Sequence, residues 1–395
     1  MLAKLRNATK QSTPSSQKFL PPWFARGGWS MTLYAAWRLE EYQSLFDPRI
    51  EPSTAESVST FSKPSIPSNG WLIDHVFTGD RHVPIFGQIS SPAHLEASDK
   101  WAAITQSIGT IIITYGIVGN LDQQKALHIL RDKACAENYT VIGIDWRAHG
   151  TTAMLSPALT SDGLHEGKDF VHIAAQAKAL GCPPPYWFLG YSLGGQLALW
   201  GVHSDSLTLA EDLGLAPTDI GGAAVVCPNL DANRSLDFLG RSLPGRMLEQ
   251  SITQKLKALA KQIHDCHPGH LNDEAIARAD SIRHFDEEFV IHRLGFDSVE
   301  EYYTASSPLP WLSEITKPVF MLYAADDPMF HPDIVPDLIT ETQHNPLIDL
   351  WVTQYGGHVG YFSGTACQQE WGDRDPWWAW NRTIDWLKAK TAQSA

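Results

Sequence analysis

The stretch Tyr186–Trp200, YWFLGYSLGGQLALW, constrains the fold of this 395-residue chain more than any other. A short aromatic run typical of a buried strand precedes the turn Gly190-Tyr191-Ser192-Leu193-Gly194, and an apolar helix is expected from Gly195. Glycines two residues before and after a serine are typical of a sharp strand-to-helix turn, because strand and helix approach too closely for a Cβ atom. We expect this turn to lift the Ser192 hydroxyl out of a sheet and to direct backbone N–H groups beside it.

Strand and helix patterns alternate along most of the chain, which predicts an α/β fold with a mostly parallel sheet and helices on both of its faces. Strands are expected at 109–114, 140–145, 186–189, 222–227, 318–324 and 348–353. Helices are expected near 122–136, 171–180 and 382–390, and a hairpin near 71–90. In such sheets ligands bind beyond the carboxyl ends of the strands.

The alternation is interrupted once, and the interruption divides the chain. Residues 1–70 are interpreted as an N-terminal arm and linker, 71–229 and 313–395 as the two parts of the core, and 230–312 as an inserted helical cap. A cap over the strand ends would supply the walls of a substrate pocket and exclude water. Within the arm, residues 19–37 are aromatic and are expected to pack on the body; the alternative is a peripheral membrane contact through exposed Trp and Phe.

Composition excludes some classes of partner. The net charge of −14 argues against nucleic acid or an anionic membrane as an electrostatic partner. The chain has neither a secretory signal pattern nor an apolar run of about 20 residues that could span a bilayer. The five cysteines include no CxxC pair, which is typical of reduced thiols, so we expect a cytoplasmic protein.

Two further motifs follow predicted strands in the order that a serine nucleophile requires. A serine hydroxyl needs a base, and the base needs a carboxylate that orients it. Asp326 and Asp327 follow the strand at 318–324, and His358 follows the strand at 348–353. We therefore predict that Ser192 is the nucleophile, His358 the base and Asp327 the acid. Asp326 remains the alternative acid, because successive residues of an extended segment point to opposite sides.

A nucleophile of this kind also needs two backbone donors for an oxyanion. One is expected from Leu193, directly after the serine, and the other from Ile117 in the loop after the strand at 109–114, where Gly116 permits the turn. The crowded His264, His267 and His270 fit no standard zinc spacing. We expect neither a metal nor an organic cofactor.

With these motifs in place, the chain resembles the α/β-hydrolase superfamily and, within it, the YheT-like branch that includes the ABHD1/2/3-type lipases (the AB hydrolase 4 family). The markers are Phe19-Leu-Pro-Pro22, Met31-Thr32, Gly190–Gly195, Cys227–Asp231, Phe285-Asp286, Gly295-Phe296, Tyr302-Tyr303, Ser306, Ala325–Pro328 and Gly356–Gly360. The resemblance assigns the three catalytic roles to Ser192, Asp327 and His358. One departure is Tyr115-Gly116, where the family has His-Gly.

The resemblance implies a serine esterase or lipase-like hydrolase that cleaves a small-molecule ester or lipid of medium or long acyl chain through an acyl-enzyme. Two alternatives stay open. Some relatives transfer the acyl group to an alcohol, and a non-catalytic binding protein can use the same fold.

Overall fold

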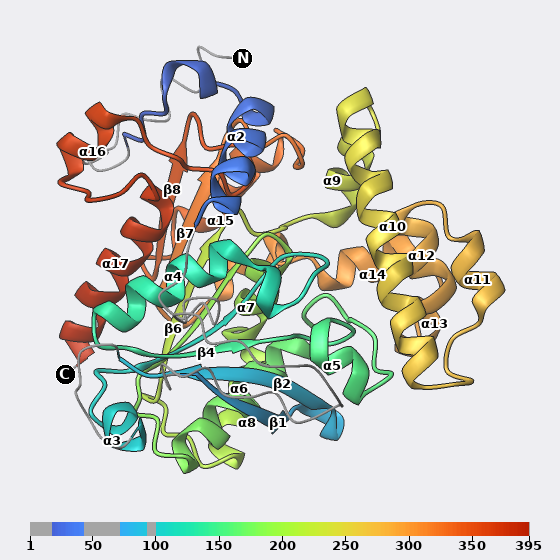
Figure 1. Cartoon of the computed structure of the whole chain (residues 1–395), viewed down its shortest axis with the longest axis horizontal. Helices are drawn as coiled ribbons and strands as arrows, with labels where there is room; N and C mark the ends of the chain where they lie inside the picture. Colours follow the sequence, from blue (N-terminus) through green and yellow to red (C-terminus); the bar gives the residue numbers. More distant parts are fainter. Residues whose placement is uncertain (1–17, 43–71, 93–99, 395) are drawn as a thin grey trace, which may run out of the picture.

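The computed structural model describes residues 18–42, 72–92 and 100–394. Of the expected N-terminal arm and linker, only residues 18–42 of the arm are described. The expected linker lies outside the described residues. Figure 1 shows a central sheet with helices on both faces, and a group of helices that projects to its right.

Eight strands of the described residues form one sheet in the order β1-β2-β4-β3-β5-β6-β7-β8. The β1–β2 and β2–β4 pairs are antiparallel, and all later neighbours are parallel. The strands are β1 (Leu72–Thr78), β2 (Pro84–Ser90), β3 (Thr110–Thr114), β4 (Thr140–Ile144), β5 (Tyr186–Tyr191), β6 (Ile220–Val226), β7 (Val319–Ala324) and β8 (Ile348–Thr353). The α/β prediction is therefore confirmed.

Helices cover both faces of this sheet. Helices α4 and α17 contact each other and the sheet on one face, whereas α6, α7 and α8 form a contiguous layer on the other. The helices of the core and arm are α2 (Gly28–Glu40), α3 (Lys100–Thr105), α4 (Lys125–Ala136), α5 (Gly150–Leu155), α6 (Glu166–Ala179), α7 (Leu193–Gly201), α8 (Ser204–Asp212), α15 (Ile334–Thr342), α16 (Thr365–Trp371) and α17 (Trp378–Ser394). Short 3₁₀ turns are η2 (Trp23–Ala25), η3 (Asp80–His82), η4 (Leu121–Gln123) and η5 (Leu309–Glu314).

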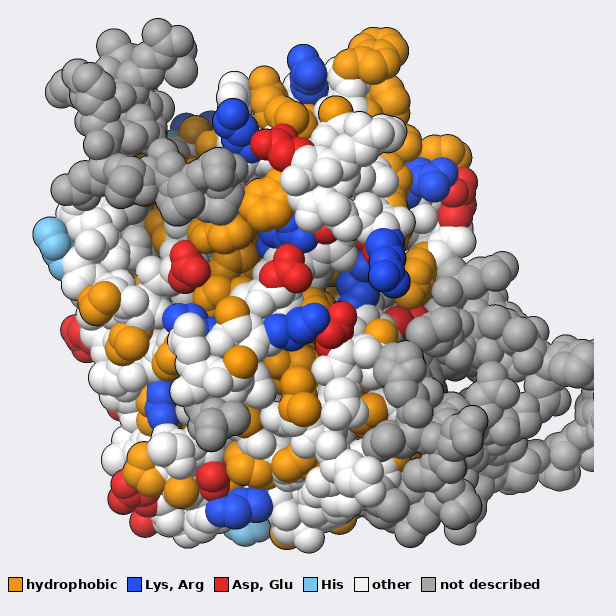
Figure 2. Space-filling model, turned by 90° about the vertical axis from the view of Figure 1, so that its left-hand side faces the viewer, with side chains coloured by type: hydrophobic (Ala, Val, Ile, Leu, Met, Phe, Trp, Pro, Cys, Tyr) orange, Lys and Arg blue, Asp and Glu red, His pale blue; other side chains and the backbone are white. Residues whose placement is uncertain are grey.

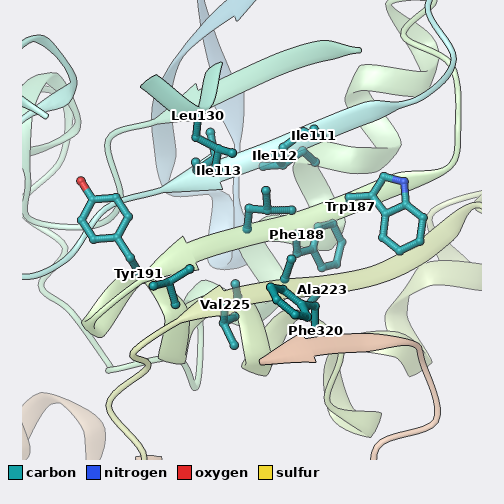
Figure 3. Packing of buried hydrophobic residues seen from close by; sticks show 14 of the residues in the cluster. Ile111, Ile112, Ile113, Leu130, Trp187, Phe188, Tyr191, Ala223, Val225 and Phe320 are labelled. Carbon is teal, nitrogen blue, oxygen red and sulfur yellow. The ribbon is translucent and has the colours of Figure 1, made fainter. Parts of the chain in front are cut away.

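The core lies around the middle strands, because β3 and β5 are buried on both faces along their whole length. Ile112 of β3 pairs with Phe188 of β5, which in turn pairs with Ala223 of β6. Figure 3 shows these side chains packed above and below the sheet, with Leu130 of α4 among them. Continuous apolar runs such as TIIIT are typical of strands buried on both faces.

Six helices lie between β6 and β7, where the sequence predicts the cap. They are α9 (Ala232–Leu239), α10 (Leu243–Cys266), α11 (Asp273–Arg278), α12 (Ile282–Phe289), α13 (Ile291–Leu294) and α14 (Val299–Ser306). Their buried apolar side chains form a second hydrophobic cluster, which includes Val118, Ala148 and Ala153 of the core. This cluster attaches the cap to the loops at the carboxyl ends of the strands.

The structure differs from the sequence-based expectations in several elements. Helices α3, α5, α8, α15 and α16 were not expected. Helix α7 begins at Leu193 rather than Gly195, because Ser192 alone completes the turn with a positive φ of 55°. Helix α2 forms within the aromatic arm, where no helix was expected, and it packs Met31 and Ala35 into the core. No helix in the described part of the chain is long and apolar enough to cross a membrane.

The packing of β5 makes a stability prediction. Phe188 is fully buried between neighbouring strands, so Phe188→Ala should lower the free energy of unfolding by about 3–5 kcal/mol. Val76→Ala on β1, where the side chain is half exposed, should cost less than about 1 kcal/mol. Chemical denaturation of both variants checks this, and equal losses would contradict the placement of the core.

Candidate active site

The turn between β5 and α7 holds Ser192 in a conformation that non-glycine residues rarely adopt, with φ 55° and ψ −129°. A Cβ atom on Gly190 would lie 2.0 Å from the Gly194 carbonyl oxygen, and one on Gly194 would lie 2.3 Å from that of Tyr115. Both contacts are with backbone, which cannot move aside easily. The two glycines are therefore required by the close approach of strand, helix and neighbouring loop.

The structure brings Ser192, His358 and Asp327 together in one hydrogen-bonded line. Nε2 of His358 lies 2.8 Å from Oγ of Ser192, and Nδ1 of the same ring lies 2.8 Å from Oδ2 of Asp327. The Asp327 side chain is 2% exposed and the His358 side chain 11%. Phe330 packs edge-on against the imidazole. This geometry allows the imidazole to accept the serine proton while the carboxylate holds the opposite nitrogen.

The adjacent aspartates point in different directions. Asp327 also accepts a hydrogen bond from the Met329 N–H through its second oxygen. Asp326 instead accepts from the Gly357 N–H at 2.9 Å, and its other oxygen is buried and has no hydrogen-bond partner in the described part of the chain. Burial raises the pKa of the Asp326 carboxyl. Asp326 therefore contacts the backbone next to His358, not its ring.

The loop after β3 lies directly against Ser192. A Cβ atom on Gly116 would be 3.0 Å from Cβ of Ser192, so a larger residue would displace the serine. Ile117 and Leu193 line the same cavity as Ser192. The Leu193 N–H lies at the start of α7, where a backbone N–H has no acceptor within the helix. The Ile117 N–H has no hydrogen-bond acceptor among the described residues. Both donors are free to bind an oxyanion.

Tyr115 explains how this loop is supported without the usual histidine. Its hydroxyl donates to Oδ1 of Asp145 at 2.6 Å, and the same oxygen accepts from the Leu121 N–H. Burial raises the pKa of Asp145 to about 6, although the hydrogen bond from Tyr115 opposes the shift. The loop is thus attached at Tyr115 and Leu121 to a carboxylate at the end of β4.

His149 supports the middle of the loop. Its Nε2 accepts from the Val118 N–H at 3.0 Å, so its Nδ1 must donate to the Arg147 carbonyl at 2.9 Å. Burial lowers the pKa of His149 to about 4, which keeps the ring neutral and able to accept. The ring stacks on Trp146 at 3.6 Å. Sequence reasoning missed this support, although His149 follows a predicted strand as His358 does.

Helix α2 of the N-terminal arm contacts the loop that carries His358. The sequence pattern does not predict this contact. Oγ1 of Thr32 on α2 accepts from the His358 N–H at 2.8 Å and donates to the Gly28 carbonyl at 2.8 Å. A Cβ atom on Gly28 would lie 1.8 Å from the Asp326 carbonyl oxygen, and one on Gly357 would lie 2.7 Å from Oγ1 of Thr32. Helix α2 therefore contacts the loops that carry Asp326 and His358.

A cavity reaches from Ser192 to the cap. Its walls are mostly apolar and come from α9, α10 and α12, including Leu236, Ile252, Leu256 and Phe285. Such a lining favours an apolar chain.

Two carboxyl groups, Asp162 of the core and Asp286 of the cap, line the same cavity. Thr160 donates to Asp162, and the Tyr303 hydroxyl donates to Asp286 at 2.5 Å. Burial, and then the repulsion of other carboxylates, raises the pKa of both aspartates.

Metal-ligating side chains do not gather at this site. Within the described ranges, no group of three or more His, Cys, Asp or Glu residues could hold a metal ion. In the histidine-rich segment that ends α10, His264 and His267 lie against different backbone carbonyls, those of Leu271 and Ala153.

Comparisons with known proteins identify the family of the chain. A family model described as "Alpha/beta hydrolase family" matches residues 122–368. The Synechocystis sp. protein named "Putative esterase slr0264" is 47% identical over 382 residues, which cover 95% of each chain. Human "Phospholipase ABHD3" is 23% identical over 303 residues, covering 77% of this chain and 69% of its own.

Among solved structures, the Pyrococcus furiosus esterase Pf2001 matches with a TM-score of 0.50 and 17% identity. The match covers 85% of this chain and 96% of that one. At this identity the likeness concerns the fold.

The Thr32 contact predicts a change in the reactivity of Ser192. Thr32→Val keeps the shape of the side chain but leaves the His358 N–H without its acceptor, so the base shifts and fluorophosphonate labelling of Ser192 should slow by about tenfold. Thr32→Ser keeps the oxygen and should label at nearly the wild-type rate. Equal labelling rates for Thr32→Val and wild type would contradict this role.

The buried carboxyl pair predicts how stability depends on pH. The pKa values of Asp162 and Asp286 in the folded protein lie above the unfolded value of about 3.9, so the protonated carboxyl groups favour folding. This stabilisation is fully present below about pH 4. It is lost as the pH rises through the pKa values of the folded protein. Asp162→Asn should therefore make the free energy of unfolding fall less steeply between pH 5 and pH 8.

Chemical denaturation at both pH values measures the slope, and the exposed Asp297→Asn is the control. Equal slopes in wild type and Asp162→Asn would contradict the predicted shift.

Proposed function

Because this chain belongs to the alpha/beta hydrolase family, we propose that it is a serine hydrolase that cleaves carboxylic esters of medium or long acyl chain through an acyl-enzyme. The observation that carries the proposal is the unbroken line of two 2.8 Å contacts from Ser192 through His358 to Asp327. The names of the similar proteins, an esterase and a phospholipase, support the reaction class.

In the proposed first step, Oγ of Ser192 attacks the ester carbonyl carbon while Nε2 of His358 takes the hydroxyl proton. The carbonyl π electrons move to its oxygen, and the N–H groups of Leu193 and Ile117 donate to that oxyanion. Asp327 orients the ring and stabilises the imidazolium. The tetrahedral intermediate then releases the alcohol, which takes the proton from His358, and the acyl group remains bonded to Ser192.

In the second step, water replaces the alcohol. His358 removes a proton from water as its oxygen attacks the acyl carbon, and the proton passes to Oγ of Ser192 when the carboxylic acid leaves.

The apolar walls contributed by the cap suggest where the acyl chain binds. Side chains such as Leu236, Ile252 and Phe285 present no hydrogen-bonding groups, so an aliphatic chain can replace water there at a favourable free energy. We propose the cap as the element that selects the acyl chain length.

Replacement of the nucleophile tests the reaction class. Ser192→Ala should lower the hydrolysis of p-nitrophenyl esters by about 10³-fold or more, and wild type should prefer acyl chains longer than acetyl. Steady-state rates across a panel from acetate to palmitate provide the measurement. Unchanged hydrolysis by Ser192→Ala would exclude this serine as the nucleophile.

The adjacent aspartates offer a matched pair of variants. Asp327→Asn places an amide against Nδ1 of His358 and should lower kcat by about 10³-fold to 10⁴-fold. Asp326→Asn keeps an oxygen that can accept from the Gly357 N–H, so its kcat should remain within about tenfold of wild type. The reverse order of effects would assign the acid role to Asp326.

A further inference from the structure

One side of the N-terminal arm presents large apolar side chains to solvent. Trp23 is 81% exposed, Leu33 66% and Trp37 56%, and Phe24 is about half exposed. We call these four residues the arm face. Scattered exposed apolar residues are ordinary, but a contiguous group of them marks a binding surface.

Ring contacts make this group contiguous. The Trp23 and Phe24 centroids lie 5.7 Å apart, Phe24 and Tyr34 lie 4.9 Å apart, and Tyr34 and Trp37 lie 5.8 Å apart. Leu33 and Trp37 are four residues apart on α2 and share one side of the helix. The surface therefore extends from η2 along the length of α2.

The opposite side of α2 is already occupied. Met31 and Ala35 are buried in the core, and Thr32 contacts the loop of His358. A helix that is apolar on both sides is normally covered on both. Among the described residues, no other element buries the arm face, which is the second side of α2.

The charge of the arm is opposite to that of the whole molecule. The first 42 residues contain six basic and two acidic residues, although the chain has a net charge of −14; these are Lys4, Arg6, Lys10, Lys18, Arg26, Arg38, Glu40 and Glu41. Lys18 and Arg26 of the arm are exposed. The Arg38 guanidinium lies 5.5 Å from the Trp37 ring and forms an ion pair with Glu41 at 2.6 Å. Figure 2 shows hydrophobic and basic side chains, with some acidic ones among them, at the upper end of the molecule, where Figure 1 places α2.

We propose that the arm face docks on an anionic lipid surface. Exposed tryptophans favour the membrane–water boundary, and nearby Lys and Arg are attracted to anionic head groups. A helix of 13 residues that remains attached to the core can lie in this boundary without crossing the bilayer. The negative charge of the rest of the molecule is repelled from the same surface, so docking is oriented with the arm toward the lipid.

Docking of this kind places the active site near lipid. Since the inner side of α2 contacts the base loop through Thr32, the arm face is separated from that loop by a single helix. Lipid binding itself does not depend on the proposed esterase reaction, so the two proposals can fail independently.

Vesicle flotation of the full-length protein tests the docking surface. Wild type should bind vesicles of phosphatidylcholine with added phosphatidylglycerol, and should bind less when the salt concentration is raised or phosphatidylglycerol is omitted. The double variant Trp23→Ala/Trp37→Ala should reduce the bound fraction by about fivefold or more. Its thermal unfolding should match wild type, because both side chains are exposed.

The matched control replaces two equally exposed apolar residues of the cap. Leu243 and Met247 of α10 are each 64% exposed, and Leu243→Ala/Met247→Ala should bind vesicles as wild type does. Equal losses in both double variants, or no vesicle binding by wild type, would overturn the proposal. A different result would identify a second copy of the chain as the occupant of the arm face. In that case the wild type would be a dimer that does not bind vesicles, and Trp23→Ala/Trp37→Ala would be a monomer.

Discussion

The arrangement of this molecule depends on the close approach of β5 and α7 at Ser192. The strand can turn into the helix within one residue only because Gly190 and Gly194 lack the Cβ atoms that would overlap neighbouring carbonyl groups. The turn leaves Ser192 with a strained backbone, and the fully buried strands β3 and β5 hold it there. The same turn leaves the Leu193 N–H without an acceptor within the described ranges and brings Gly116 against Ser192. The strained backbone and the candidate site therefore arise from the same turn.

Much of the fold could be predicted because its signals are local. Apolar runs of strand length, the serine between two glycines, and motifs directly after strands are visible within a few residues. The sequence leaves Asp326 and Asp327 as alternatives, because the choice between them depends on how the loop after β7 meets the loop that carries His358. Helix α2 was missed, since its Gly pair and aromatic residues do not form a regular helical pattern. The Thr32 contact with His358 joins residues 326 positions apart and exists only in the folded chain.

Several groups near Ser192 are arranged at some cost to stability. Asp162 and Asp286 are buried close to other carboxylates, and one oxygen of Asp326 has no hydrogen-bond partner among the residues that the structure describes. Stability comes from elsewhere, chiefly from the aromatic and aliphatic side chains around the central strands (Figure 3). Such a division is typical of proteins whose site needs a defined polar arrangement within an apolar cavity. Tyr115, Asp145 and His149 illustrate it, because they hold the loop after β3 through buried hydrogen bonds.

The central claim is that Ser192 carries the acyl group during turnover. The most direct test mixes the protein with a p-nitrophenyl ester, quenches the mixture in acid within one turnover, and determines the mass of the peptide that contains Ser192. The account predicts that this peptide gains the mass of the acyl group and that Asp327→Asn slows its appearance. An unmodified Ser192 peptide during steady hydrolysis, or an acyl group on another residue, would contradict the account.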